Sequence, residues 1–142
     1  MSIDADVDWR LELTKITAPV HASLRLQGVA EGLVVRGRVE TRATHTCHRC
    51  LQPYDEEIAL EITEVLGLEG DPDGYALADQ DADVEPPLRD AVLLTAPLSP
   101  TCRADCLGLC SQCGADLNTG ACPGHEQEID SPFAVLRELL EP

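Results

Sequence analysis

Apolar and polar residues alternate along most of residues 9–66, which is the two-residue period of β-strands with one buried face. Three runs show this period: VHASLRLQG, GLVVRGRVETRATHTC and EEIALEITEVL. Their apolar faces contain Val20, Ala22, Leu24 and Leu26, then Leu33, Val35, Val39, Thr41 and Ala43, then Ile58, Leu60 and Ile62. A further strand is predicted in DWRLELTK, through Trp9, Leu11 and Leu13. The pattern predicts one antiparallel β-sheet with one face in solvent.

Two later stretches have the period of a helix. In EPPLRDAVLLTAP, proline suits the first turn, Pro97 ends the helix, and one face contains Leu88, Ala91, Val92 and Thr95. In DSPFAVLRELLEP, Asp130 or Ser131 can cap a helix, Pro132 fits its first position, and the apolar stripe contains Phe133, Leu136, Leu139 and Leu140. Between the sheet and the first helix, GLEGDPDGYALADQDADVEPP is rich in Gly, Pro and Asp and has no period, so it predicts a long acidic loop.

These elements predict a single α+β domain with an antiparallel β-sheet and a few short helices. Residues 1–66 form the β-sheet region, which ends past a hairpin at CHRC, and residues 67–87 form the acidic loop. Residues 88–142 contain a helix, a cysteine-rich zinc-knuckle segment and a C-terminal helix. Aromatic residues are only 3% of the 142-residue chain, so the core must be mainly aliphatic. A bound metal would add stability to a core of this kind.

The charge of the chain is strongly negative and unevenly distributed. The formal net charge is −16, from 26 acidic and 10 basic residues. This charge disfavours contact with a phosphate backbone and favours basic or protein partners. Half of the acids, 13, lie between Asp55 and Asp90, whereas five of the basic residues lie between Arg25 and Arg49. The basic region is either an ordinary solvated sheet face or a contact face for RNA or a protein partner, formed by Arg36, Arg38, Arg42 and Arg49.

The N-terminal stretch MSIDADVDWRLELTK lacks the basic and apolar regions of a secretory signal. No apolar run approaches the roughly 18 residues of a membrane-spanning helix. We therefore expect a soluble, cytoplasmic protein with no membrane contact. Thiols stay reduced in that compartment, and seven cysteines cannot all pair within one chain. Metal ligation is the leading explanation for these cysteines.

The seven cysteines and one histidine fall into four short pairs. These are Cys47 and Cys50 in CHRC, Cys102 and Cys106 in CRADC, Cys110 and Cys113 in CSQCG, and Cys122 and His125 in CPGH. A Cys-x-x-Cys pair can grip one zinc ion from a tight knuckle, and Gly114 suits the turn that follows. Eight ligands are enough for two closed tetrahedral sites. The preferred partition places the first two pairs in one site and the last two pairs in the other, with one or two structural Zn²⁺ ions.

Other interpretations of the cysteines remain open at this point. A rival partition joins Cys47 and Cys50 to Cys110 and Cys113, as in a zinc ribbon. An iron–sulfur cluster and redox-active or unligated thiols are further alternatives, and His45 or His48 could substitute as a ligand. HEQE lacks the second histidine of a His-Glu-x-x-His protease, and the deaminase signature is missing. Because closed shells leave no position for a small-molecule substrate, we expect no enzymatic activity and no catalytic residues.

Three longer runs resemble a known family. They are CHRCLQPYDEEI, LRDAVLLTAPLSPTCRADCLGLCSQCGADLN and IDSPFAVLREL, with an acidic loop between the first two. They resemble the bacterial YceD-like family of large ribosomal RNA subunit accumulation proteins, over about residues 20–140. The resemblance implies an accessory factor for large-subunit ribosomal RNA and assigns no catalytic residues. The family would have a second cysteine near the last one, so His125 is inferred as a ligand from its chemistry.

Residues and resemblance together predict a non-enzymatic, zinc-stabilised factor for 23S ribosomal RNA accumulation and ribosome assembly. The expected partner is a precursor of the large ribosomal subunit, contacted through a basic ribosomal protein or through 23S rRNA. The alternative is a zinc-ribbon adaptor between proteins in transcription or another assembly. A metal-dependent hydrolase would require an open coordination position.

Overall fold

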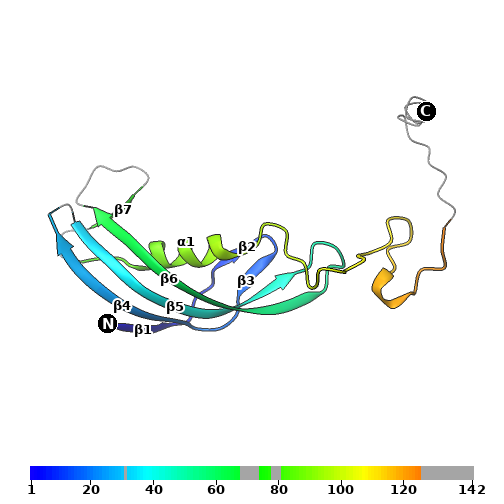
Figure 1. The fold of residues 1–142 in the computed structure, drawn as a ribbon, viewed down its shortest axis with the longest axis horizontal. Helices are drawn as coiled ribbons and strands as arrows, with labels where there is room; N and C mark the ends of the chain where they lie inside the picture. The colour runs from blue at the N-terminus through cyan, green and yellow to red at the C-terminus, as the bar shows by residue number, and fades with distance from the viewer. Residues whose placement is uncertain (31, 68–73, 78–80, 126–142) are drawn as a thin grey trace, which may run out of the picture.

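The computed structural model describes residues 1–30, 32–67, 74–77 and 81–125 of the chain. Within them, one α-helix packs on one face of a seven-stranded sheet, and a segment with little regular structure follows (Figure 1). The strands are β1 (Ser2–Ala5), β2 (Arg10–Leu11), β3 (Thr14–Ile16), β4 (Val20–Val29), β5 (Gly32–Thr46), β6 (Pro53–Gly67) and β7 (Tyr75–Ala76). The α-helix is α1 (Glu85–Thr95), and a short 3-10 helix spans Leu117–Thr119.

The central strand of the sheet is β5, which pairs with β6 along its full length. On its other side β5 pairs first with β4 and then, near its end, with β3. Strand β1 extends the sheet beyond β4, and β2 extends it beyond β3. All of these pairs are antiparallel, so the predicted antiparallel sheet is confirmed. The short β7 is parallel to β6.

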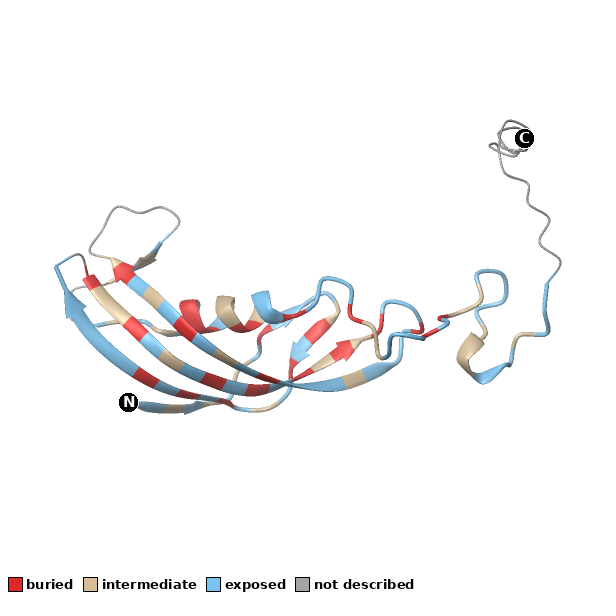
Figure 2. Cartoon of the chain, in the orientation of Figure 1, coloured by how far each residue is buried: buried red, intermediate tan, exposed pale blue. Residues whose placement is uncertain are grey.

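The core lies between one face of the sheet and α1. Figure 2 shows buried and more exposed residues alternating along β4, β5 and β6. The buried side chains are Val20, Ala22 and Leu24 in β4, Val35, Val39 and Ala43 in β5, Ile58, Ile62 and Leu66 in β6, and Leu88 and Val92 in α1, together with Trp9 and Ile16. The alternation in the sequence therefore identifies the buried face. Leu26, at the far end of β4, is an exception because it is exposed.

Two predicted elements differ in the structure. The strand expected through Trp9, Leu11 and Leu13 is a hairpin of β2 and β3, with Leu11 exposed and Trp9 buried just before it. The Trp9 indole Nε1 donates to Glu85 Oε1 at 3.2 Å, so its polar atom is bonded to the first residue of α1. The chain therefore turns at residues 12 and 13, between β2 and β3, instead of continuing as one straight strand.

The stretch expected to be an acidic loop, residues 67–87, is partly regular. Gly67 ends β6, Tyr75–Ala76 forms β7, and α1 begins at Glu85. At these positions the structure has regular elements where a long acidic loop was expected. Tyr75 packs against the core, and its hydroxyl donates to Asp90 Oδ2 at 3.1 Å. The contacts of Tyr75 thus help to fix this segment on the core, although the sequence around Tyr75 has no strand or helix period.

Helix α1 is confirmed, and its buried side faces the sheet. It has proline in its first turn, as expected, and buries Pro87, Leu88 and Val92. It contacts β6. The second predicted helix, in residues 130–142, lies outside the described residues, and the division of the chain into three regions stays a prediction. Within the described ranges, no helix has the length and apolar character needed to cross a membrane.

The β5–β6 hairpin extends beyond α1 and carries the CHRC turn at its tip (Figure 1). The segment after α1 follows the same direction, so its cysteines lie at the end of the molecule farthest from β7 (Figure 1). The described part of the chain is therefore elongated, with the helix-covered sheet at one end and the cysteines at the other.

Gly37 in β5 marks a close approach of β4 and β5. A Cβ atom there would lie 2.1 Å from the Ser23 carbonyl oxygen and 2.9 Å from the Leu24 Cα, both of which are backbone atoms. We expect Gly37→Ala to lower the free energy of unfolding by about 1–3 kcal/mol, because the two strands must separate to admit the methyl group. Urea denaturation followed by circular dichroism measures this loss.

Gly28→Ala in β4 is the matched control, because a Cβ at Gly28 has no neighbour within 4 Å. This variant should change the free energy of unfolding by less than about 0.5 kcal/mol. Equal losses in the two variants would show that strand propensity, rather than the close approach, determines the cost.

Candidate metal centres

The first cysteine pair lies at the tip of the β5–β6 hairpin. Cys47 follows β5 directly, and its backbone N–H donates to the Gln52 carbonyl at 2.9 Å, while the Leu51 N–H donates to the Cys47 carbonyl at 2.9 Å. These bonds close a tight turn. Leu51 has φ 59°, a left-handed conformation that is uncommon for a leucine. The turn aims Cys47 and Cys50 in one direction and leaves both side chains buried.

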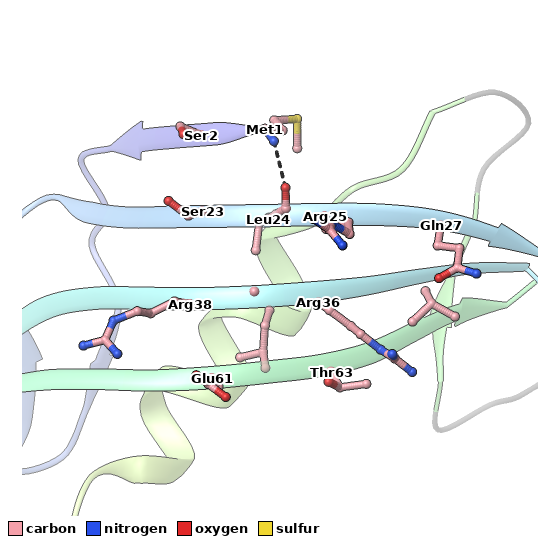
Figure 3. A pocket seen from close by; sticks show the side chains of 13 residues that line it. Met1, Ser2, Ser23, Leu24, Arg25, Gln27, Arg36, Arg38, Glu61 and Thr63 are labelled. Atoms are coloured by element: carbon pink, nitrogen blue, oxygen red, sulfur yellow. Dashed lines mark hydrogen bonds between the residues drawn. The ribbon is translucent and has the colours of Figure 1, made fainter.

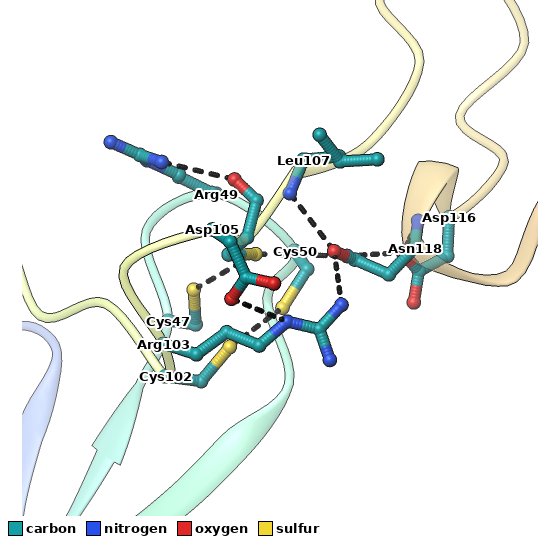
Figure 4. A network of polar contacts seen from close by, with 10 residues as sticks. Cys47, Arg49, Cys50, Cys102, Arg103, Asp105, Leu107, Asp116 and Asn118 are labelled. Carbon is teal, nitrogen blue, oxygen red and sulfur yellow. Dashed lines mark hydrogen bonds and ion pairs between the residues drawn. The ribbon is translucent and has the colours of Figure 1, made fainter.

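The second pair, Cys102 and Cys106, is held against this tip by backbone contacts. The His48 N–H donates to the Pro100 carbonyl at 2.8 Å, and the Leu109 N–H donates to the Arg49 carbonyl at 3.0 Å. Arg49 also donates from Nη1 to the Cys106 carbonyl at 3.0 Å (Figure 4). The hairpin tip and residues 100–109 are thus joined on both sides of the cysteines.

The four sulfur atoms lie at the spacing of a tetrahedral thiolate site. Cys47 Sγ is 3.9 Å from Cys106 Sγ, and Cys50 Sγ is 3.7 Å from Cys102 Sγ. All four lie within 4.8 Å of one another. A zinc ion bound at about 2.3 Å by four sulfurs separates them by roughly 3.8 Å, the edge of the tetrahedron. The donor set and its geometry therefore fit one such ion.

Asn118 supports this site from outside the ligand set, and it was not among the residues predicted from the sequence. Its Nδ2 donates to Cys106 Sγ at 3.6 Å, and its Oδ1 accepts from Leu107 N at 2.9 Å and from Arg103 Nη2 at 2.7 Å (Figure 4). Asp116 Oδ1 accepts from the Asn118 backbone and side chain at 2.9 and 2.6 Å. A turn with Asp two residues before Asn was visible in the sequence, but its position beside Cys106 depends on the fold.

The second group closes within a short length of chain. The Cys110 N–H donates to the Ala115 carbonyl at 2.8 Å, and the Gly114 N–H donates to the Cys110 carbonyl at 2.8 Å. Gly114 has φ 71°, the conformation for which glycine was expected after the knuckle. Cys113 Sγ lies 3.9 Å from Cys122 Sγ, and the ligand atoms of this pair, Cys110 and His125 lie within 4.8 Å of one another.

The two groups differ in their exposure to solvent. In the first, Cys102 is half-buried and the other three cysteines are buried. In the second, Cys110 and Cys122 are half-buried, and Cys113 and His125 are exposed. The first group belongs to the packed structure, whereas the second lies at the surface.

Thiols of the first group differ in how readily they lose a proton. Burial raises the pKa of Cys47, but backbone N–H groups of Cys102, Cys50 and Arg49 donate to its sulfur and bring the pKa down to about 6. Burial and hydrogen bonds to the Cys47 and Cys50 sulfurs raise the pKa of Cys102 to about 12. The Cys47 thiolate thus forms readily, whereas Cys102 keeps its proton. A divalent cation would release that proton.

The second group repeats this arrangement. Backbone N–H groups of Cys113 and Gln112 donate to the Cys110 sulfur and lower its pKa to about 6, against the opposing effect of burial. The Gly124 N–H favours ionisation of Cys122 in the same way, but burial and proton sharing with Cys110 and Cys113 leave its pKa raised.

The structure brings together the two groups of the preferred partition rather than those of the rival one. Metal ligation by the eight residues stays a prediction.

Neither His45 nor His48 belongs to either group of candidate ligands. His45 is buried, with Nδ1 at 2.8 Å from Thr14 Oγ1; its Nε2 lies 3.2 Å from Glu56 Oε2 without hydrogen-bond geometry. His48 Nδ1 lies 2.9 Å from the Pro100 carbonyl oxygen.

The four candidate contact arginines do not form one surface. Arg36, Arg38 and Arg42 lie at even-numbered positions of β5, on the exposed face. Figure 3 shows Arg36 and Arg38 in front of the sheet, with α1 behind. Arg38 pairs with Glu40 at 2.7 Å, and Arg42 pairs with Glu57 at 3.0 Å. Arg49 lies instead at the hairpin tip, where it braces Cys106. Arg25 on β4 is the cross-strand partner of Arg36. The alternation of residues along β4 assigns Arg25 to the solvent face, but the pairing of Arg25 with Arg36 follows only from the strand register.

Comparison with known proteins identifies the family. The family model described as large ribosomal RNA subunit accumulation protein YceD matches residues 35–140. The chain belongs to the YceD family. The resemblance found in the sequence is thereby confirmed, and the match includes both cysteine groups.

The relatives of this YceD family member include bacterial and plastid proteins. An uncharacterized protein of Mycobacterium tuberculosis is 39% identical over 144 residues, which cover 93% of this chain and 68% of the relative. An uncharacterized protein of Mycobacterium leprae is 33% identical, with 93% and 65% covered. The large ribosomal RNA subunit accumulation protein YCED homolog 1, chloroplastic, of Zea mays is 27% identical, with 71% and 46% covered. No solved structure matches the chain.

Single ligand substitutions should separate the two metal centres. We expect Cys50→Ser and Cys113→Ser each to lower the bound metal from two ions to one, measured by elemental mass spectrometry. Cys50→Ser should also lower the free energy of unfolding of the sheet by about 4 kcal/mol, because the ion cross-links cysteines 52 residues apart.

Cys113→Ser is the matched control, because its loop to Cys122 spans only nine residues and the group is at the surface. It should leave the unfolding of the sheet unchanged. Two ions retained by both variants would contradict the assignment, as would equal destabilisation by both.

Alkylation should distinguish the two half-buried thiols of the second group after the metal is removed. At about pH 7 Cys110 lies above its pKa and is mostly thiolate, the reactive form, whereas the raised pKa keeps Cys122 protonated. Iodoacetamide should therefore modify Cys110 first, and its rate should fall as the pH drops below about 6. Peptide mass spectrometry measures both rates. Equal rates would contradict the proposed proton sharing, and restored metal should protect both thiols.

Proposed function

We propose that this protein is a non-enzymatic accessory factor that promotes the accumulation of large-subunit 23S ribosomal RNA during ribosome assembly. The observation that carries this proposal is the family match over residues 35–140, which includes most of β5, all of β6 and α1, and both cysteine groups. The plastid relative of Zea mays has the same description. The two descriptions support a role in the accumulation of large-subunit ribosomal RNA.

The proposed cofactor is one structural Zn²⁺ in each cysteine group. Thiolate and imidazole are the ligands that zinc prefers, and the sulfur spacings of 3.7 and 3.9 Å suit its tetrahedral geometry. The first ion would fix residues 102–106 to the hairpin tip. The second would order the loop from Cys110 to His125, which has few buried side chains of its own.

The non-enzymatic character follows from the proposed coordination. A catalytic zinc keeps one position for water or substrate, whereas each group here offers four protein ligands. The Asn118 amide donates to a ligand sulfur and thereby partly neutralises its charge, which suits a permanent structural site.

The proposed partner is a precursor of the large ribosomal subunit in the cytoplasm. A net charge of −16 favours a basic ribosomal protein as one contact. Direct contact with 23S ribosomal RNA would be restricted to the face of the sheet that carries Arg36, Arg38 and Arg42. A protein adaptor unconnected with the ribosome is the alternative.

Sedimentation tests the function. A tagged copy expressed in its own bacterium should co-migrate with immature large-subunit particles on a sucrose gradient, and depletion should lower 23S relative to 16S ribosomal RNA. The same strain complemented with Cys113→Ser reveals whether the surface centre is required. If the protein stays at the top of the gradient and 23S levels do not change on depletion, the ribosomal function is wrong and the adaptor alternative replaces it.

A further inference from the structure

A hollow of about 670 Å³ lies on the face of the sheet opposite α1, over the middle of β4, β5 and β6. Figure 3 shows its side chains in front of the sheet, with the helix behind. Its polar lining includes Arg25 and Gln27 from β4, Arg36 and Arg38 from β5, and Glu61 and Thr63 from β6. Residues of three paired strands thus converge on one open surface.

Two arginines in this hollow face each other directly. Arg25 and Arg36 are cross-strand partners in the β4–β5 register. Like charges in directly opposed positions destabilise a sheet. Among the described residues, neither has a carboxylate oxygen within 4.0 Å, whereas Arg38 and Arg42 on the same face each have one. In a chain with 26 acidic residues, an opposed and unneutralised pair of arginines needs an explanation.

The distribution of acids places the positive charge at one end of the hollow. Glu61 is the cross-strand partner of Arg38, and Glu40 forms an ion pair with the same arginine. Arg36 is instead opposite Thr63 on β6 and Arg25 on β4. The Arg25–Arg36 end is therefore flanked by the neutral side chains of Gln27 and Thr63, which can donate hydrogen bonds and carry no charge that would neutralise the guanidinium groups.

We propose that Arg25 and Arg36 form a phosphate-binding site for the backbone of single-stranded ribosomal RNA. Each guanidinium offers a fork of N–H donors that matches two phosphate oxygens, and an anion between the two arginines removes their repulsion. Gln27 and Thr63 donate to the remaining phosphate oxygens or to a ribose hydroxyl. The choice of RNA as the source of the phosphate rests on the proposed function.

The sheet holds the site in a fixed geometry. Gly37 lies between Arg36 and Arg38, and its lack of a side chain allows β4 and β5 to approach closely beneath the hollow. Both arginines are on paired strands, so the spacing of their backbones does not change when the ligand binds. Arg49 has no part in this site, because its guanidinium braces Cys106 at the hairpin tip.

Fluorescence anisotropy with a labelled short oligouridine RNA tests the proposal, using the full-length, metal-loaded protein at about 50 to 200 mM potassium chloride. The double variant R25Q/R36Q should bind the RNA about tenfold more weakly at the lowest salt, with a salt slope reduced by about 2. Its melting temperature should be equal to or higher than that of the wild type, because the substitution removes repulsion between exposed side chains.

The matched control is R10Q/R89Q, which removes the same charge from two arginines that have carboxylate partners and lie outside the hollow and the cysteine groups. It should change the affinity less than about twofold. The proposal is overturned if wild-type protein does not bind the RNA at low salt, if both double variants weaken binding equally, or if polyglutamate competes as well as RNA does. The last result would assign the hollow to an acidic protein.

A complementation assay separates this proposal from the proposed function. The double variant R25Q/R36Q should fail to restore 23S ribosomal RNA in the depleted strain, whereas the control variant restores it. If both restore it, the ribosomal function stands and the phosphate site is wrong. If depletion of the wild type has no effect on 23S, the ribosomal function itself is wrong, and the anisotropy result alone decides whether the hollow binds RNA.

Discussion

The register of the β5–β6 hairpin is the constraint on which the rest of the structure depends. It pairs fifteen residues of each strand, from Gly32 with Gly67 to Thr46 with Pro53. A shift of one residue would turn Val35 and Val39 from the core to solvent, because successive side chains point to opposite faces. The same shift would misplace Cys47 relative to Cys50 and move Arg36 away from its neighbours. One set of backbone hydrogen bonds therefore positions the core, the cysteine turn and the arginine face.

In both cysteine groups, four ligands lie close together, and the groups differ in their exposure to solvent. Thiolates close together repel each other, and the free groups respond by ionising one sulfur and keeping protons on others. In the first group three of the four cysteines are buried, so backbone N–H groups at Cys47 and the Asn118 amide at Cys106 supply polar contacts to the sulfurs. In the second group, solvent can also stabilise the thiolate charge, because its ligands are exposed or half-buried. This difference in burial suits a metal that permanently joins distant segments in the first group, and one that closes a short loop at the surface in the second.

Much of the fold could be predicted because its information is local. Alternation at Val20 to Leu24 and at Ile58 to Ile62 marks the buried face, and proline followed by helical spacing marks α1. The pairing of cysteines was also accessible, since ligand count and spacing favoured one partition. The missed features all depend on contacts between distant segments. Tyr75 forms β7 through its contact with the core, and Asn118 reaches Cys106 only when the 3-10 turn packs beside it. Arg25 and Arg36 meet only through the strand register.

The distance in sequence between the halves of the first cysteine group also constrains the order of events during synthesis. Cys50 and Cys102 are 52 residues apart, so the hairpin leaves the ribosome as an incomplete site, with two thiols at its tip that lack their partner ligands. A translating chain can form the β5–β6 ladder and its core before the remaining ligands exist, since domains acquire structure from the N-terminal side during synthesis. During synthesis the sheet can therefore be assembled while the cysteine turn is still open. The order in which the ligand residues are synthesised, as well as the final geometry, determines when the first two thiols can be covered by metal coordination.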